Sequence, residues 1–236
     1  RGGTHPYDGK ILSRDAAIEE IKPGEELVFP LSQHIGAPAV PIVEIGERVL
    51  AGQKIAAKSG FISANIHSSV SGTVIKIEPR TIATGGKVNS IIIRNDNLYE
   101  QAPPINDKNP DDMTDDEIRT VIEEAGIVGM GGAGFPTNVK LTPKNPEVID
   151  TIIVNGAECE PYLTSDYRRM LEYTDELVKG LKIVLRLFPG ARGVFGVEDN
   201  KPEAIKALKK ATSGENNIEV AVLKTKYPQG GERCMI

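Results

Sequence analysis

The sequence predicts a mixed α/β chain in which a small all-β domain precedes a domain built on a parallel sheet. Between residues 27 and 95, short β-branched runs alternate with glycine and proline turns and helical periodicity is scarce, which indicates a small β-sandwich or barrel. Between residues 148 and 223, strand-like apolar runs alternate with amphipathic helical segments. That alternation is typical of parallel strands joined by crossover helices.

Shifts in composition divide the chain into four segments. In order, these are an N-terminal arm, the β domain, a linker and the α/β domain, at residues 1–26, 27–95, 96–113 and 114–236. The linker is rich in Pro, Asn and Asp, which favour turns over packed structure. Thr114 and Glu117 then have the spacing of a capping box, which predicts that a helix begins there.

Charge and composition exclude several classes of protein. The chain of 236 residues has a formal net charge of −5, so a general nucleic-acid surface, which needs a basic face, is not expected. No apolar run reaches the length of a membrane span, and the first residues lack the pattern of a secretory signal. Cys159 and Cys234 are expected to be reduced, and two thiolates are too few for an iron–sulfur cluster, which needs about four. Because the chain ends in an apolar segment soon after a glycine pair, we expect a fragment of a longer protein.

The α/β domain is expected to contain three strands with helices between them. Each strand is a short run rich in β-branched residues, and each helix has apolar residues on one face. In chain order these elements are strand 148–155, helix 166–187, strand 193–197, helix 202–211 and strand 218–223.

Two polar loops follow strands of this expected sheet. The acidic loop, residues 155–162, follows the first strand, and the tyrosine loop, residues 227–233, comes soon after the third. In open parallel sheets, ligands bind at the carboxyl ends of the strands. The sequence therefore predicts that these two loops converge on one ligand site.

A third candidate for ligand binding is the glycine loop, residues 129–137. Five of its first six residues are glycine or alanine, and Lys140 follows, so bare backbone N–H groups and a cation can both face an anion. The alternative is a tight, close-packed turn. The spacing G-x-G-x-x-G is present, but the run follows a helix rather than a strand and Pro136 interrupts it. A conventional dinucleotide fingerprint is therefore less favoured than another nucleotide-type site.

The β domain resembles biotinyl and lipoyl carrier domains, which are barrel-sandwich hybrids. The similarity lies in Gly-Glu-Arg-Val-x-x-Gly-Gln-Lys-Ile at residues 46–55 and Ile-His-Ser-Ser-Val-Ser-Gly-Thr-Val at residues 66–74. A carrier presents a lysine at a hairpin tip between these turns. Here the tip region is residues 58–62, and Lys58 falls before the expected tip. The resemblance therefore implies the carrier fold without the carrier chemistry.

The three loops together resemble a family of redox proteins. Gly-x-Gly-Gly-Ala-Gly-Phe-Pro-Thr-x-x-Lys, Asn-x-x-Glu-x-Glu-Pro and Tyr-x-x-Gly-x-Glu occur in this order, as in the NADH-oxidising flavoprotein subunit of respiratory complex I. With the β domain in front, the chain is most similar to the C subunits of Rnf-type complexes, the membrane-bound ferredoxin:NAD⁺ oxidoreductases that pump Na⁺ or H⁺. The resemblance covers essentially the whole chain and implies a Rossmann-like parallel sheet of the complex I flavoprotein type.

The resemblance assigns roles to individual residues but no general acid, nucleophile or metal ligand. Residues expected at the flavin and its phosphate are Gly129, Gly131, Gly132, Ala133, Gly134 and the cation of Lys140, with Asn155 and Glu158 beside the isoalloxazine and ribityl chain. Residues expected at NADH are Glu160, Glu232, Tyr227 and Gly230. Complex I carries Arg, Asp, Gly and Glu at the positions of Met130, Ala157, Cys159 and Gly231, so the hydrogen bonding to both cofactors is expected to differ in detail.

The implied function is electron transfer between NAD(H) and bound FMN. In this family a further segment, absent here, carries [4Fe–4S] clusters that pass electrons on, so this fragment alone is expected to be inactive. The implied partners are the other Rnf subunits and, through them, ferredoxin, at the cytoplasmic face of the membrane without a span of its own. The alternatives are a related flavoprotein reductase on the same scaffold, such as a cobalamin-reducing subunit, and a non-catalytic docking scaffold.

Overall fold

The computed structural model describes residues 2–130 and 132–236, and the chain divides into two compact units. The barrel unit comprises residues 21–144, and the sheet unit combines residues 145–236 with the first twenty residues. This grouping differs from the sequence-based segments in two places. The beginning of the chain packs as part of the sheet unit instead of forming a free arm, and residues 114–144 pack with the barrel unit.

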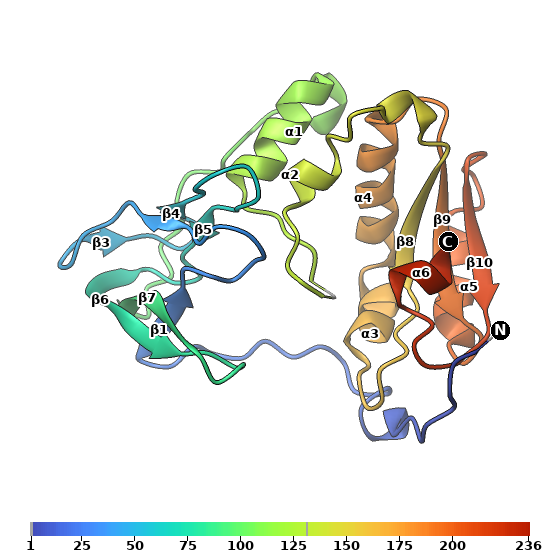
Figure 1. Ribbon diagram of the computed structural model, residues 1–236, viewed down its shortest axis with the longest axis horizontal. Coiled ribbons are helices and arrows are strands. Elements are labelled where there is room, and N and C mark those ends of the chain that lie inside the picture. The colour runs from blue at the N-terminus through green and yellow to red at the C-terminus, as the bar shows by residue number, and fades with distance from the viewer. Residues whose placement is uncertain (1, 131) are drawn as a thin grey trace. The chain divides into compact units, whose positions relative to one another are not determined.

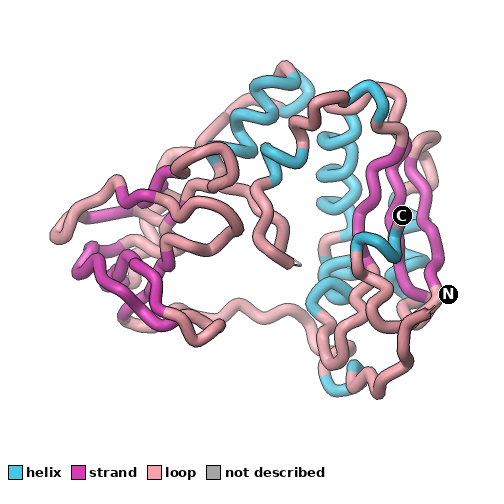
Figure 2. Tube along the Cα trace, viewed as in Figure 1, coloured by secondary structure: helices cyan, strands magenta, loops and turns pink. Residues whose placement is uncertain are grey.

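The barrel unit contains two antiparallel sheets, drawn in blue and green in Figure 1 and as magenta segments in Figure 2. One sheet has the strand order β1-β7-β6-β3 and the other β2-β4-β5. In chain order the strands are β1 (Glu26–Pro30), β2 (Val40–Pro41), β3 (Arg48–Val49), β4 (Lys54–Ala57), β5 (Ile66–His67), β6 (Gly72–Thr81) and β7 (Lys87–Asn95). Apolar side chains from both sheets form one core, in which Ile55, Val74 and Ile91 are fully buried. The small β-sandwich expected between residues 27 and 95 is confirmed.

A helical segment completes the barrel unit. After the short helix η2 (Pro110–Asp112), helix α1 (Asp115–Glu124) begins at the expected capping box, where Glu117 N donates to Thr114 Oγ1 (3.3 Å) and Thr114 N donates to Glu117 Oε2 (2.8 Å). At its other end, Asn65 Nδ2 donates to Glu123 O (3.2 Å). Lys54 and Lys58 form ion pairs with the last two residues of the helix. The one-turn helix α2 (Thr137–Lys140) follows the glycine loop.

The sheet unit is built on three parallel strands in the order β10-β9-β8. After the short helices η1 (Lys10–Leu12) and η3 (Pro146–Val148), its elements are β8 (Thr151–Gly156), α3 (Ser165–Glu172), α4 (Thr174–Arg186), β9 (Arg192–Glu198), α5 (Pro202–Ala211), β10 (Ile218–Leu223) and α6 (Glu232–Met235). Crossover helices pack closely on the sheet, because a Cβ on Gly193 of β9 would lie 2.7 Å from Leu181 of α4. No helix in the described part of the chain is long and apolar enough to cross a membrane.

The prediction of one continuous helix at residues 166–187 is wrong. The segment 166–187 forms two helices, α3 and α4, because Tyr173 leaves the helical region (φ −129°, ψ 36°). Thr174 Oγ1 donates to Met170 O at 2.5 Å, and the Arg169 guanidinium lies 5.1 Å from the centre of the Tyr173 ring. Hydroxyl bonds of this kind to the preceding turn compete with the helical backbone pattern. The apolar face continues across the break, which is why the sequence pattern did not reveal it.

The capping box predicts a pH dependence of stability for the barrel unit. Hydrogen bonds lower the pKa of Glu117 from 4.5 to about 2. The bond from Lys108 has the largest effect, and the two bonds from Thr114 come next. A carboxyl whose folded pKa is depressed contributes stability that is present above its unfolded pKa and is lost as pH falls through its folded pKa. In Glu117→Gln, which keeps a capping amide oxygen, we expect a shallower fall of the unfolding temperature between pH 4.5 and 2, measured by circular dichroism. Glu25→Gln, at an exposed glutamate of the same unit, is the control and should follow the wild type.

Candidate functional site

The glycine loop belongs to the barrel unit and is closed at its base by backbone hydrogen bonds. Gly129 N donates to Phe135 O (2.9 Å), and Thr137 N donates to Ile127 O (2.9 Å). Gly126, which ends the preceding helical turn at φ +65°, lies so close to the barrel that a Cβ there would be 2.2 Å from Asn65 O. Of the residues expected here, Gly131 lies outside the described part of the chain.

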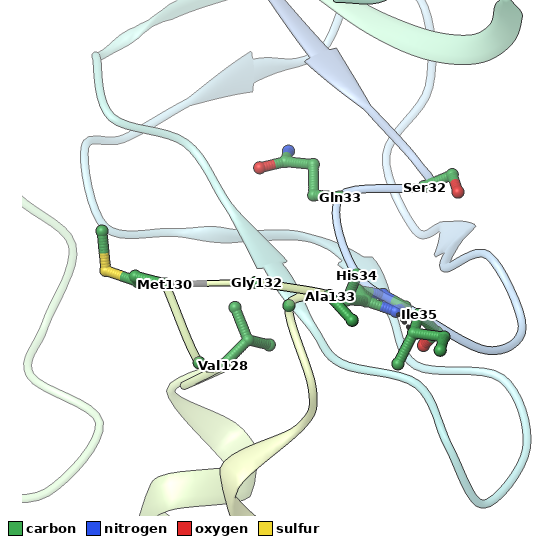
Figure 3. Close-up of a pocket in the computed structure, with 10 residues that line it drawn as sticks. Ser32, Gln33, His34, Ile35, Val128, Met130, Gly132 and Ala133 are labelled. Atoms are coloured by element: carbon green, nitrogen blue, oxygen red, sulfur yellow. Dashed lines mark hydrogen bonds between the residues drawn. The ribbon is translucent and has the colours of Figure 1, made fainter. Parts of the chain in front are cut away.

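Residues 32–35, which follow β1, form a platform against which the glycine loop packs. Ile35 N donates to Ala133 O (3.0 Å), and a Cβ on Gly134 (φ +63°) would lie 2.9 Å from Gln33 O. An open hollow of about 490 Å³ lies between the platform and the loop. Figure 3 shows Met130 and Gly132 along one side of this hollow and Gln33 along the other. The β domain therefore supplies one wall of the glycine-loop site.

Two glycines of this loop are not required by the packing of the barrel unit. A Cβ on Gly132 would meet no atom within 4 Å, and the nearest atom to one on Gly129 would be Phe135 O at 3.8 Å. Neither residue has the positive φ that favours glycine. The N–H groups of Gly132 and Ala133 donate to no acceptor among the described residues. Lys140, at the end of the one-turn helix that follows, is exposed but is not among the described residues that line the hollow, so the hollow itself offers a ligand bare backbone.

The acidic and tyrosine loops converge at the carboxyl edge of the parallel sheet, as the sequence predicted. Asn155 Nδ2 donates to Gly230 O (2.8 Å), and Gly230 N donates to Cys159 Sγ (3.3 Å). Asn155 Oδ1 also accepts from Ala157 N (3.1 Å), which fixes the start of the acidic loop. The approach is close, because a Cβ on Gly230 would lie 2.4 Å from Ala157 O.

The acidic side chains at this edge fall into two groups. Glu160 and Glu232 are exposed, as is Tyr227, whose side chain is 42% exposed. Glu158 is 3% exposed and points into the sheet unit, where its Oε1 accepts from Asp166 N (2.8 Å) at the beginning of α3. Its Oε2 accepts no hydrogen bond from the described residues, and burial raises the pKa of this carboxyl. Glu158 therefore supports the loop from inside, whereas Glu160 is accessible to a ligand.

A buried ionic network lies beneath the two loops and was not expected from the sequence. Lys201 is 2% exposed, and its Nζ donates to Glu198 Oε2 (3.0 Å) and to Glu158 O (3.2 Å). Glu198 Oε1 accepts from Lys226 N (3.3 Å), next to the tyrosine loop. The network thus joins the acidic loop to the tyrosine loop. Glu198 and Lys201 are opposite charges three residues apart at the end of β9, which is the signal that sequence reasoning could have used.

The first residues of the chain also contact both loops. Thr4 and Tyr227 exchange two backbone hydrogen bonds of 2.8 Å, and Tyr162 N donates to Asp8 O (2.6 Å). Lys10, almost completely buried, reaches carbonyl groups at the end of the acidic loop. From the sequence this segment is expected only as an N-terminal arm, and no local pattern in it indicates these contacts.

The structure thus places the expected site residues in two groups. In the barrel unit are Gly129, Gly132, Ala133, Gly134 and Lys140; in the sheet unit are Asn155, Glu158, Glu160, Tyr227, Gly230 and Glu232. Cys159 is a buried free thiol and Cys234 an exposed one. No cluster of His, Cys, Asp or Glu that could hold a metal ion occurs among the described residues.

Both parts of the chain match known protein families. Residues 1–98 match the family described as the RnfC barrel sandwich hybrid domain. Residues 122–236 match the family described as the Nuo51 FMN-binding domain.

Curated relatives align with the whole chain. The chain is 44% identical to the C subunit of the proton-translocating ferredoxin:NAD(+) oxidoreductase complex of Clostridium ljungdahlii and covers 52% of it. It is 43% identical to the C subunit of the Na(+)-translocating complex of the same kind from Acetobacterium woodii and covers 54% of it. It is 41% identical to the C subunit of the ion-translocating oxidoreductase complex of Pseudomonas aeruginosa and covers 30% of it. The chain therefore spans about half the length of the first two relatives.

Among solved structures, a chain of an NAD⁺-reducing [NiFe]-hydrogenase aligns with 50% of this chain at 26% identity, with 22% of the hydrogenase chain covered. The TM-score is 0.43, which is too low to support an argument about the fold.

The contact between the two strand-end loops predicts the effect of a single methyl group. In Gly230→Ala the new Cβ overlaps Ala157 O, so we expect the free energy of unfolding to fall by about 1–3 kcal/mol, as for overpacked sites. In the control Gly180→Ala, within α4, the new methyl meets open space, and we expect a gain of about 0.5–1 kcal/mol. Urea unfolding measures both. Equal effects of the two substitutions would contradict the close approach of the loops.

Proposed function

Because the chain belongs to the family of C subunits of ion-translocating ferredoxin:NAD⁺ oxidoreductase complexes, we propose that it forms the flavin- and NADH-binding part of such a protein. It exchanges electrons between NAD(H) and bound FMN. In the whole protein, [4Fe–4S] clusters outside this chain relay the electrons, and the complex couples their flow to Na⁺ or H⁺ translocation. The parallel sheet is then a Rossmann-like domain of the complex I flavoprotein type.

The observation that carries this proposal is the convergence of the acidic and tyrosine loops. Asn155 of one loop and Gly230 of the other are joined by a 2.8 Å hydrogen bond at the carboxyl edge of the sheet, where ligands of open parallel sheets bind. The exposed carboxylates of Glu160 and Glu232 are hydrogen-bond acceptors for ribose hydroxyl or carboxamide groups of NADH. We assign the dinucleotide to this edge, with Tyr227 along the same pocket.

We assign FMN to the glycine loop and its hollow. The fit rests on the space above Gly132, which a Cβ would occupy, and on the bare N–H groups. We propose the exposed Lys140, in the helix after the loop, as a cation for the phosphate. When bound, FMN supplies the change from two-electron hydride transfer to one-electron transfer. The chain's own part is to bind the two cofactors, and no general acid or nucleophile is required.

Two residues of the acidic loop differ in what they can offer a ligand. Asn155 uses one amide hydrogen and one lone pair within the loops, so one donor and one acceptor remain for a ligand at this edge of the sheet. Glu158 is buried and bonded to the beginning of α3. We therefore propose that Glu158 holds the loop in shape and leaves direct contacts with the cofactors to its neighbours.

The proposed partners are the other subunits of the complex, with ferredoxin reached through them, at the cytoplasmic face of the membrane. The names of the relatives as complex subunits support the first of these. The relatives' shared membership of redox complexes favours this function over a docking scaffold, for which no flavin would be expected.

The proposal predicts that flavin binding depends on the open space above Gly132. In the full-length protein we expect bound FMN, measured by its absorption, and bleaching when NADH is added. Gly132→Val should lower FMN affinity by about tenfold or more, or about 1.4 kcal/mol. The unfolding temperature of the FMN-free protein should be unchanged, because a Cβ at this position meets no protein atom within 4 Å.

Gly24→Val is the matched control, since Gly24 lies in the same unit and also faces open space. It should retain FMN. A wild-type protein without flavin would overturn the proposed function, and normal FMN retention in Gly132→Val would move the flavin away from this loop.

A further inference from the structure

The start of the chain contributes a buried cation to the acidic loop. We propose that Lys10 is a positioning residue for NADH binding: it holds the acidic loop in the conformation that presents Glu160 to the dinucleotide. This inference rests on the proposed function and extends the site to a residue 150 positions away in the sequence.

All the hydrogen-bonding capacity of Lys10 is directed at this loop. The residue is 7% exposed, and its Nζ donates to Glu160 O (2.9 Å) and to Leu163 O (2.5 Å). An ammonium group has three donors, and the remaining one faces Glu158 Oε2, the atom without a hydrogen bond, at 3.8 Å. Lys10 thus bridges the backbone on both sides of Tyr162 and neutralises the carboxylate below it.

The backbone at Tyr162 needs this support because it is strained. Tyr162 has a φ of +68°, an unusual conformation for a residue with a bulky side chain. Asp8 accepts its N–H (2.6 Å), and Gly9 (φ +60°) lies so close that a Cβ there would be 2.3 Å from the Tyr162 ring. The hydrogen bond from Tyr162 N to Asp8 O, the contact with Gly9 and the two hydrogen bonds from Lys10 hold this turn. Release of the turn would move the Glu160 carboxylate with its backbone.

The neighbouring buried cation cannot take the place of Lys10. Lys201 already donates to Glu158 O, Glu198 Oε2 and Asn200 Oδ1. Removal of Lys10 therefore leaves two carbonyl groups without this donor and a buried carboxylate without its nearest counter-ion, and both changes disfavour the observed loop. Burial lowers the pKa of Lys10 and raises that of Glu158, which is consistent with a pair enclosed by the loop.

The test compares Lys10→Met with Arg14→Met in the full-length protein. Arg14 is a half-exposed cation on the same segment, and its ion pair is with its exposed neighbour Asp15, so its variant is expected to behave as the wild type. In Lys10→Met we expect faster hydrogen exchange at amides of residues 158–163 but not in β9. We also expect the KM for NADH to rise about tenfold or more, which corresponds to about 1.4 kcal/mol. The kcat, measured with an artificial one-electron acceptor, and the FMN content should change little.

A double variant distinguishes a specific effect on NADH binding from a general loss of stability. Lys10→Met with Glu158→Gln removes the unpaired buried charge, so it should unfold at a higher temperature than Lys10→Met alone. Its KM should stay raised, because the carbonyl groups still lack their donor. Unchanged exchange in the acidic loop, or a normal KM despite faster exchange, would overturn the role of Lys10. Absence of NADH oxidation in the wild type would instead overturn the proposed function, while the exchange result would still decide whether Lys10 holds the loop.

Discussion

The edge of the parallel sheet depends on the buried ion pair between Lys201 and Glu198. Both side chains are nearly inaccessible, and charges in such a place are tolerated only when paired and fully hydrogen-bonded. Their further bonds include those to the backbone of the acidic loop and to the residue before the tyrosine loop. The energetic requirement that these charges be satisfied thus dictates where both loops lie. Asn155 and Gly230 can meet because the network below has already fixed their neighbours.

The barrel unit resembles a carrier domain in fold, and here it supports the glycine loop. The hairpin tip where a carrier would place its lysine holds residues 58–62, and Lys58 is used in an ion pair with α1. The same α1 leads directly into the glycine loop, which then rests on the platform after β1 through the Ile35–Ala133 hydrogen bond. A packed β core therefore supports a loop of small residues, which have few side-chain contacts of their own to hold its shape.

Regular elements and loop convergence could be predicted from the sequence because both follow from local patterns. The helix at 202–211 and the strand at 218–223 occur at the expected residues, and parallel topology alone implies that the loops after β8 and β10 share an edge. The break at Tyr173 could not be predicted, since the apolar face continues through it. Nor could the inward turn of Glu158, because a loop carboxylate is normally solvated and its partner Lys10 belongs to a segment distant in the sequence. Long-range pairing of single polar residues leaves no periodic signal in a chain.

The bridge between Thr4 and Tyr227 joins two residues that are far apart in the sequence. During synthesis Thr4 leaves the ribosome long before the tyrosine loop exists, and domains fold as units in the order of their emergence. The barrel unit, residues 21–144, is complete while the segment before it still lacks the strands on which it must dock. The pairing partner of Thr4 arrives more than two hundred residues later. Assembly of the sheet edge therefore follows the folding of the barrel unit, so the acidic and tyrosine loops meet in a molecule whose barrel unit has already folded.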